Sequence, residues 1–201
     1  CPVLDPRIDR LIQPLKSDLE ASGWPVDRHG LSGGLRHLGL RVGQHSGEVL
    51  ITLIASQRDL PGLEELAQEW SSRWDEVVGV GLNLQPEATN QLMGARTDTL
   101  VGRGWLNESF AGLDVRIAAD TFFQVHTQQA ERVVPWLIEA FGGADGRLVD
   151  AYCGIGTYSL PLAAAGWRGL GVEPQGPALG VVGDTAASRE SEDGAGFEEP
   201  V

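Results

Sequence analysis

A short apolar strand that leads into a glycine turn constrains the fold of this chain more than any other feature. The strand covers residues 148–152, the turn is Gly154-Ile155-Gly156, and a helix follows through Ala165. A second apolar run over residues 170–172 ends at Glu173. Strand, glycine turn, helix, strand and acid together predict the start of a doubly wound α/β domain. Such a domain needs about five to seven strands, so the predicted sheet is incomplete.

The first 118 residues show a different pattern, in which strands alternate with only two helices. Apolar residues at helical spacing predict helices over residues 2–23 and 60–74. Alternating apolar runs predict strands over residues 35–42, 48–55, 77–84, 99–105 and 113–117, the first two forming a hairpin. We therefore expect an α+β central domain over residues 1–118. The α/β domain then covers residues 119–179 and opens with an amphipathic helix over residues 127–141.

The end of the chain has another composition. Residues 180–201 hold six acidic residues against Arg189 and show no helical periodicity. They predict an acidic tail that is disordered or frame-shifted, and we favour the frame shift because a half-built sheet is a poor natural terminus. Because the chain begins with Cys1 rather than Met, we expect it to be a fragment of a longer protein.

Charge and cysteine content exclude several classes of protein. The net charge is −13, of which −8 falls on residues 1–179, so composition does not suggest a broad phosphate-binding surface. No apolar run reaches the roughly 20 residues that span a bilayer, and no signal peptide opens the sequence. The two cysteines make no disulfide framework. We expect a cytoplasmic monomer without membrane contact.

The glycine turn indicates a nucleoside site. Gly154 and Gly156 let a ligand approach the backbone closely, and the Glu173 carboxylate can accept hydrogen bonds from ribose hydroxyls. Asp150 at the strand end suits a cationic nucleoside without phosphate, such as S-adenosylmethionine. A dinucleotide enzyme, which normally has a third glycine, and a purely structural turn remain open alternatives.

Two longer segments resemble the RNA uracil-C5 methyltransferases, which form 5-methyluridine in 23S rRNA and tRNA. They are Asp120-Thr-Phe-Phe-Gln-Val-His126 and Val149-Asp-Ala-Tyr-Cys-Gly-Ile-Gly-Thr-Tyr-Ser-Leu-Pro-Leu162, followed by Gly171-Val-Glu173. Upstream, Cys1-Pro-Val-Leu-Asp-Pro6, Gly34-Leu-Arg-His-Leu38 and Thr89-Asn90 are similar to the family's central domain. The resemblance implies S-adenosylmethionine-dependent methylation of uracil C5 in RNA, with 23S rRNA expected as the substrate and tRNA as the alternative.

The resemblance also implies roles for single residues. Those that match cofactor-binding positions are Gln124, Tyr152, Gly154, Gly156, Thr157 and Glu173, with Thr157 standing where the family often has Asn. Phe122 matches a residue near the target base, although Phe122 and Phe123 could equally be core residues. Cys1 matches the last of four cysteines that hold a [4Fe-4S] cluster in the rRNA-type members.

The chemistry needs groups that this sequence does not contain. A cysteine thiolate must add to C6 of uracil, and a general base must remove the C5 proton. In the family these are a Ser-Cys-Asn-Pro cysteine and a glutamate near the C-terminus, and neither motif occurs here. Cys153 lies in the glycine turn, where we expect it to pack. We therefore expect the chain to be inactive alone. A methyltransferase for small molecules or proteins and a non-catalytic remnant are the remaining alternatives.

Overall fold

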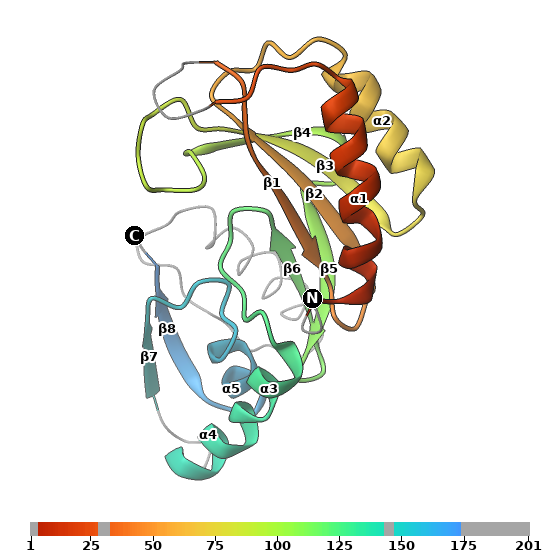
Figure 1. Cartoon of the computed structure of the whole chain (residues 1–201). Coiled ribbons are helices and arrows are strands. Elements are labelled where there is room, and N and C mark those ends of the chain that lie inside the picture. Colours follow the sequence, from red (N-terminus) through yellow and green to blue (C-terminus); the bar gives the residue numbers. More distant parts are fainter. Residues whose placement is uncertain (1–3, 28–32, 143–146, 174–201) are drawn as a thin grey trace. The chain divides into compact units, whose positions relative to one another are not determined.

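The computed structural model describes residues 4–27, 33–142 and 147–173 (Figure 1). Contacts divide the chain into two compact units. The first unit comprises residues 1–106 and 118–120, and the second comprises residues 107–117 and 121–201. The domain boundary expected near residue 118 stays a prediction. Cys1 and the predicted tail after residue 179 lie outside the described residues.

A four-stranded sheet forms the centre of the first unit. Its strands, in spatial order, are β1 (Leu35–Val42), β2 (Val49–Ala55), β3 (Val77–Leu84) and β4 (Arg96–Gly102). The β1–β2 pair is antiparallel, which confirms the predicted hairpin, and β3–β4 is antiparallel as well. The β2–β3 pair is parallel and needs a crossover, which contains helix α2 (Leu63–Arg73).

Two helices cover one face of this sheet (Figure 1). Helix α1 (Pro6–Ala21) begins where the Asp5 side chain accepts a hydrogen bond from the Arg7 backbone N at 2.8 Å, with proline in the first turn. The fully buried members of the resulting core are Leu11, Leu15, Val49, Ile51, Leu53, Ala55, Leu63, Ala67, Trp70, Val80 and Leu82. The helical spacing of the sequence therefore corresponds to the faces of α1 and α2 that meet the sheet.

The strand predicted over residues 99–105 is wrong at its C-terminal end. Strand β4 ends at Gly102, which has a φ of 72° and lies so close to Val78 that a Cβ would be 2.3 Å from its carbonyl oxygen. A separate strand, β5 (Trp105–Phe110), follows and pairs with β6 (Leu113–Ala118). Strand β5 is not predicted by the sequence pattern, because Asn107 and Glu108 are poor strand formers.

The rest of the second unit is the predicted beginning of an α/β domain. Helices α3 (Thr127–Glu131) and α4 (Val133–Phe141) precede strand β7 (Arg147–Ala151), helix α5 (Ser159–Ala164) and strand β8 (Arg168–Val172). Strands β7 and β8 are parallel, as predicted. The helix expected over residues 127–141 is interrupted at Arg132, because Pro135 has no N–H and its ring would clash with the Glu131 carbonyl.

Within the described ranges, no helix combines the length and apolar composition that crossing a bilayer requires.

Candidate cofactor site

The turn between β7 and α5 is fastened to the end of the neighbouring strand. The backbone N–H groups of Tyr152 and Cys153 both donate to the carbonyl oxygen of Val172, at 2.7 and 3.1 Å. Tyr152 has a φ of 66°, which is rare for a residue with a side chain, and Gly154 and Gly156 have φ values of 57° and 76°. The left-handed backbone turns the chain sharply away from β7, and this conformation favours glycine at residues 154 and 156.

The two glycines have different surroundings. A Cβ at Gly154 would meet no heavy atom within 4 Å, so open space lies beside this part of the backbone. A Cβ at Gly156 would lie 2.9 Å from Leu160 Cγ, so this glycine allows α5 to pack closely on the turn. Gly154 is therefore the position at which a ligand can approach the main chain, and Gly156 is the position at which α5 packs against the turn.

Glu173 is the acidic residue that the sequence places after β8, and its side chain turns back to the glycine turn. Its Oε2 accepts a hydrogen bond from the Gly154 backbone N at 2.9 Å. Tyr152, in the same turn, is 80% exposed, whereas Thr157 is partly buried. The structure thus brings Gly154 and Glu173 into direct contact, with Tyr152 on the exposed side of the turn.

The two phenylalanines of the Phe-Phe-Gln segment before α3 differ, since one is exposed and the other is packed. Phe122 is 72% exposed, whereas Phe123 packs edge-on against Phe110, with ring centroids 5.7 Å apart. Phe110 in turn contacts Tyr158 after the glycine turn, at 6.2 Å. Phe110 therefore joins the Phe-Phe-Gln segment to the glycine-turn segment, a role that the sequence analysis missed because it did not predict β5.

Phe122 and Gln124 do not help to hold the glycine turn. The hydrogen bonds that hold the described glycine turn involve neither side chain. Gln124 is partly buried. Exposure leaves Phe122 accessible to a ligand, and the reading of this residue as core is wrong.

Cys153 packs in the turn, as expected. It is 8% exposed, and burial, followed by the nearby carboxylates of Asp150 and Glu173, raises the pKa of its thiol. The thiolate is the nucleophilic form of cysteine, so this environment disfavours nucleophilic chemistry at Cys153.

The described residues contain no group of three or more potential metal ligands from His, Cys, Asp and Glu. The predicted cluster ligand, Cys1, lies outside the described residues. A [4Fe-4S] cluster takes four thiolates, and this chain has two cysteines. The residues present therefore cannot complete a cluster by themselves.

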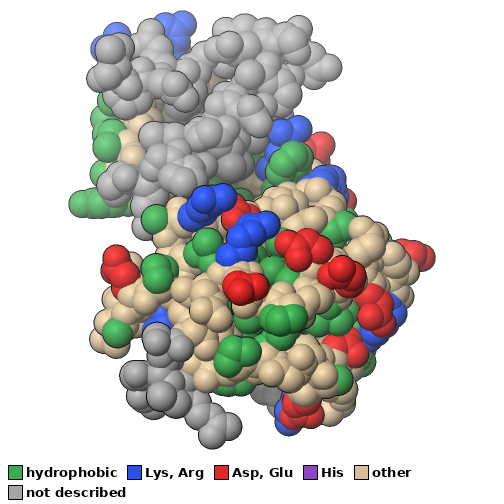
Figure 2. Space-filling model, turned by 90° about the horizontal axis from the view of Figure 1, so that it is seen from above, with side chains coloured by type: hydrophobic (Ala, Val, Ile, Leu, Met, Phe, Trp, Pro, Cys, Tyr) green, Lys and Arg blue, Asp and Glu red, His purple; other side chains and the backbone are tan. Residues whose placement is uncertain are grey.

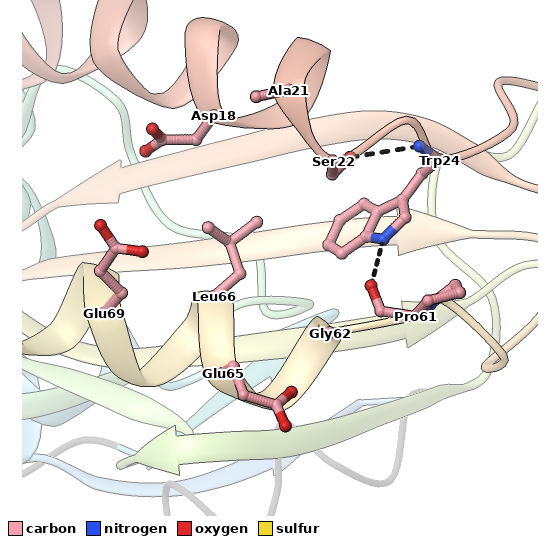
Figure 3. Close-up of a pocket in the computed structure, with 9 residues that line it drawn as sticks. All are labelled: Asp18, Ala21, Ser22, Trp24, Pro61, Gly62, Glu65, Leu66 and Glu69. Atoms are coloured by element: carbon pink, nitrogen blue, oxygen red, sulfur yellow. Dashed lines mark hydrogen bonds between the residues drawn. The ribbon is translucent and has the colours of Figure 1, made fainter.

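A separate pocket of about 380 Å³ lies between α1 and α2 in the first unit (Figure 3). Trp24 borders it and donates from Nε1 to the Pro61 carbonyl at 2.7 Å. Of its carboxylates, Asp18 accepts hydrogen bonds from Trp70 Nε1 at 2.9 Å and from Arg73 at 2.7 Å. These bonds tie the two helices together, and the pocket shares no residue with the predicted cofactor site.

Comparisons with known proteins agree with the motif-based resemblance. The sequence profile of the family described as tRNA (uracil-5-)-methyltransferase matches residues 45–180. A protein of Parasynechococcus marenigrum named as an uncharacterized RNA methyltransferase is 55% identical, over 86% of this chain and 38% of that protein. A protein of the same description from Nostoc sp. is 44% identical, over 89% of this chain and 39% of its own length. The chain thus spans about two fifths of the length of these relatives.

Solved structures show the same fold. The tRNA (uracil-54, C5)-methyltransferase of Pyrococcus abyssi, in complex with S-adenosyl-L-homocysteine, superposes with a TM-score of 0.77. The match covers 100% of this chain and 47% of that one, at 22% sequence identity. The predicted fold class is confirmed: an α+β part is followed by the beginning of a Rossmann-like α/β methyltransferase domain.

Proposed function

The chain belongs to the tRNA (uracil-5-)-methyltransferase family, and from this premise we propose that the full-length protein methylates uracil C5 in RNA with S-adenosylmethionine as the methyl donor. The observation that carries the proposal is the hydrogen bond between Gly154 and Glu173 at the carboxyl ends of two parallel strands. Ligands of open α/β sheets bind at this edge. A small-molecule or protein methyltransferase would share the turn, but the family match favours RNA.

The residues of the turn fit S-adenosylmethionine. The space beside Gly154 accommodates a ligand against the backbone, and the Glu173 carboxylate lies where it can accept hydrogen bonds from ribose hydroxyls. We assign Tyr152, Gly156, Thr157 and Gln124 to the same cofactor site.

When bound, S-adenosylmethionine supplies an electrophilic methyl group. The chain's own contribution is to hold and orient that group, with Phe122 placed beside the target uracil. The thiolate that adds to C6 and the base that removes the C5 proton come from parts of the full-length protein beyond this sequence. Cys153 does not take the thiolate role, because burial raises the pKa of its thiol and so disfavours the thiolate.

For the substrate we propose 23S rRNA, because the sequence around Cys1 resembles the segment that carries the last cluster cysteine of the rRNA-type members. In this proposal the full-length protein is a cytoplasmic monomer and holds a [4Fe-4S] cluster, with Cys1 as one ligand. A tRNA substrate is the second candidate, supported by the family's description and by the tRNA substrate named for the Pyrococcus abyssi enzyme.

The test uses the full-length protein with unmodified 23S rRNA and unmodified tRNA transcripts, followed by mass spectrometric detection of 5-methyluridine. Methylation of 23S rRNA alone supports the proposal, and methylation of tRNA alone transfers it to the second candidate. Methyl transfer to neither RNA contradicts both.

Two matched variants test the cofactor site. Glu173→Gln removes the carboxylate charge, and we expect at least tenfold weaker S-adenosylmethionine binding by calorimetry, since hydrogen bonds to charged groups are the stronger ones. Glu139→Gln, an exposed position on α4, is the control and leaves the affinity unchanged. Equal affinities in the two variants would remove Glu173 from the site.

A further inference from the structure

A loop in the first unit is exposed at its tip and anchored at its base by buried amide side chains. The loop covers residues 86–95, between β3 and β4, and residues 86–92 are exposed. The anchoring side chains belong to Asn83 and Gln85, which are 0% and 3% exposed. Burying an amide is costly unless its polar atoms are hydrogen-bonded. The partners of these two buried amides therefore show how the loop is held.

Asn83 fixes the end of the loop that leads into β4. Its Nδ2 donates to the Gly94 carbonyl at 3.0 Å and to Thr97 Oγ1 at 2.9 Å, while its Oδ1 accepts from the Gly94 backbone N at 2.7 Å. Gly94 lies so close to β3 that a Cβ would be 1.9 Å from the Leu84 carbonyl oxygen. The buried Asn83 side chain therefore hydrogen-bonds both polar backbone groups of Gly94, which packs directly against β3.

Gln85 holds the middle of the loop. Its Nε2 donates to the carbonyl oxygens of Gln91 and Met93, at 3.3 and 3.1 Å, and its Oε1 accepts from the Glu87 backbone N at 3.3 Å. In addition, Arg36 of β1 donates to the Gln85 and Glu87 carbonyl oxygens, at 2.7 and 2.8 Å. The backbone of the loop is thus held by side chains from β1 and from the end of β3, rather than by regular strand pairing.

The exposed tip of the loop carries two neutral amide side chains, and the carboxylate of Glu87 lies in the same exposed stretch. The side chains of Asn90 and Gln91 are exposed, and Leu92 beside them is 54% exposed. Asn and Gln amides offer paired donors and acceptors that match the edges of bases, and unpaired RNA bases expose those edges. A loop that is already ordered loses less conformational entropy when it binds, so the anchoring favours recognition.

The surface charge limits the ways in which RNA can be held. Figure 2 shows acidic and basic side chains interspersed over the described part of one face, rather than a continuous basic patch. Residues 1–179 carry a net charge of −8. Contact between this part of the protein and RNA therefore depends on local hydrogen bonds more than on general attraction to phosphate.

From these observations we infer that the loop tip at Asn90 and Gln91 binds unpaired bases of the RNA substrate. This inference rests on the proposed function. It assigns part of substrate recognition to the first unit, separate from the glycine turn in the second.

The test is the double variant Asn90→Ala/Gln91→Ala in the full-length protein. We expect the KM for RNA to rise about tenfold while kcat and the affinity for S-adenosylmethionine stay within twofold of wild type. The dependence of RNA affinity on salt keeps its slope, because neutral side chains release no counterions. Gln68→Ala, an exposed amide on α2, is the control and changes none of these values.

Other outcomes overturn the inference. An unchanged KM for RNA in the double variant removes the loop from substrate binding, and normal RNA binding with loss of a bound protein would assign the tip to a protein partner. If the wild-type protein methylates no RNA, the proposed function fails. Direct RNA-binding measurements on wild type and double variant still decide whether the tip contacts RNA.

Discussion

Strand β2 lies inside the four-stranded sheet of the first unit, whereas β7 of the second unit pairs with β8 in a two-stranded sheet, and the two strands differ in burial. All seven residues of β2 are buried. Along β7 exposed residues alternate with partly buried ones, and Val149 is 70% exposed, with Leu170 and Val172 of the paired β8 at 36% and 44%. Parallel sheets are normally covered on both faces. The first unit therefore holds a closed core, whereas the described part of the second leaves apolar sheet surface open beside its glycine turn.

Among the described helices, only α1 has a side-chain cap, which Asp5 supplies. Helix α2 of the first unit and α3, α4 and α5 of the second have no side-chain cap hydrogen bond. Capping and core packing both stabilise elements locally. We infer that the first unit contributes most of the folding stability and that the second unit carries the residues of the candidate cofactor site.

Two tryptophans provide the strongest test of this comparison. Trp70 in α2 is fully buried and its Nε1 bonds Asp18, whereas Trp136 in α4 is 65% exposed. We expect Trp70→Ala to lower the free energy of unfolding by about 3–5 kcal/mol, since it opens a cavity and removes a hydrogen bond. Trp136→Ala should change it by about 0.5 kcal/mol or less. Urea unfolding followed by circular dichroism measures both, and equal losses would refute the comparison.

Two glycines with similar φ values provide a second test of the comparison between the units. Gly156 in the second unit has a φ of 76° and no space for a Cβ, whereas Gly62 in the first has a φ of 74° and open space around it. Gly62→Ala should cost about 1 kcal/mol for the left-handed backbone alone. Gly156→Ala should cost about 3 kcal/mol, because the contact with Leu160 adds overpacking. Thermal unfolding compares the two, and only Gly156→Ala should also weaken S-adenosylmethionine binding.

The helix cap gives the smallest expected effect. Replacing Asp5 by alanine should destabilise the first unit by about 1 kcal/mol, and Asp5→Asn, which keeps an acceptor, should cost less. The hydrogen bond from the Arg7 side chain lowers the pKa of Asp5 below 3.8. Its carboxylate therefore stabilises the fold above pH 3.8, and this stabilisation is lost as the pH falls through the lowered pKa.

Unfolding curves at several pH values between neutrality and pH 2 test this prediction. The difference between wild type and Asp5→Ala should shrink towards the acid end. A difference that stays constant would show that the carboxylate charge does not contribute.

Much of the first unit could be predicted from sequence because its signals are local. The bounds of β1 and β3 are those that the apolar runs predict, and α1 and α2 lie within the predicted helices. The errors have two different causes. Strand β4 ends at Gly102 because of its approach to Val78, which is distant in sequence, whereas the helix break at Arg132 is a local effect of Pro135 meeting a carbonyl four residues earlier.

In the candidate site, too, some features follow from local sequence and others from tertiary packing. By itself the sequence determined the strand, the glycine turn and the acid at Glu173, because glycine and apolar periodicity act on the backbone within a few residues. Only the tertiary structure decided that Glu173 meets Gly154, that Phe123 packs on Phe110 while Phe122 is exposed, and that Asn83 and Gln85 anchor a loop. Burial and hydrogen bonding depend on partners from other elements, and those partners are set by packing rather than by neighbouring residues.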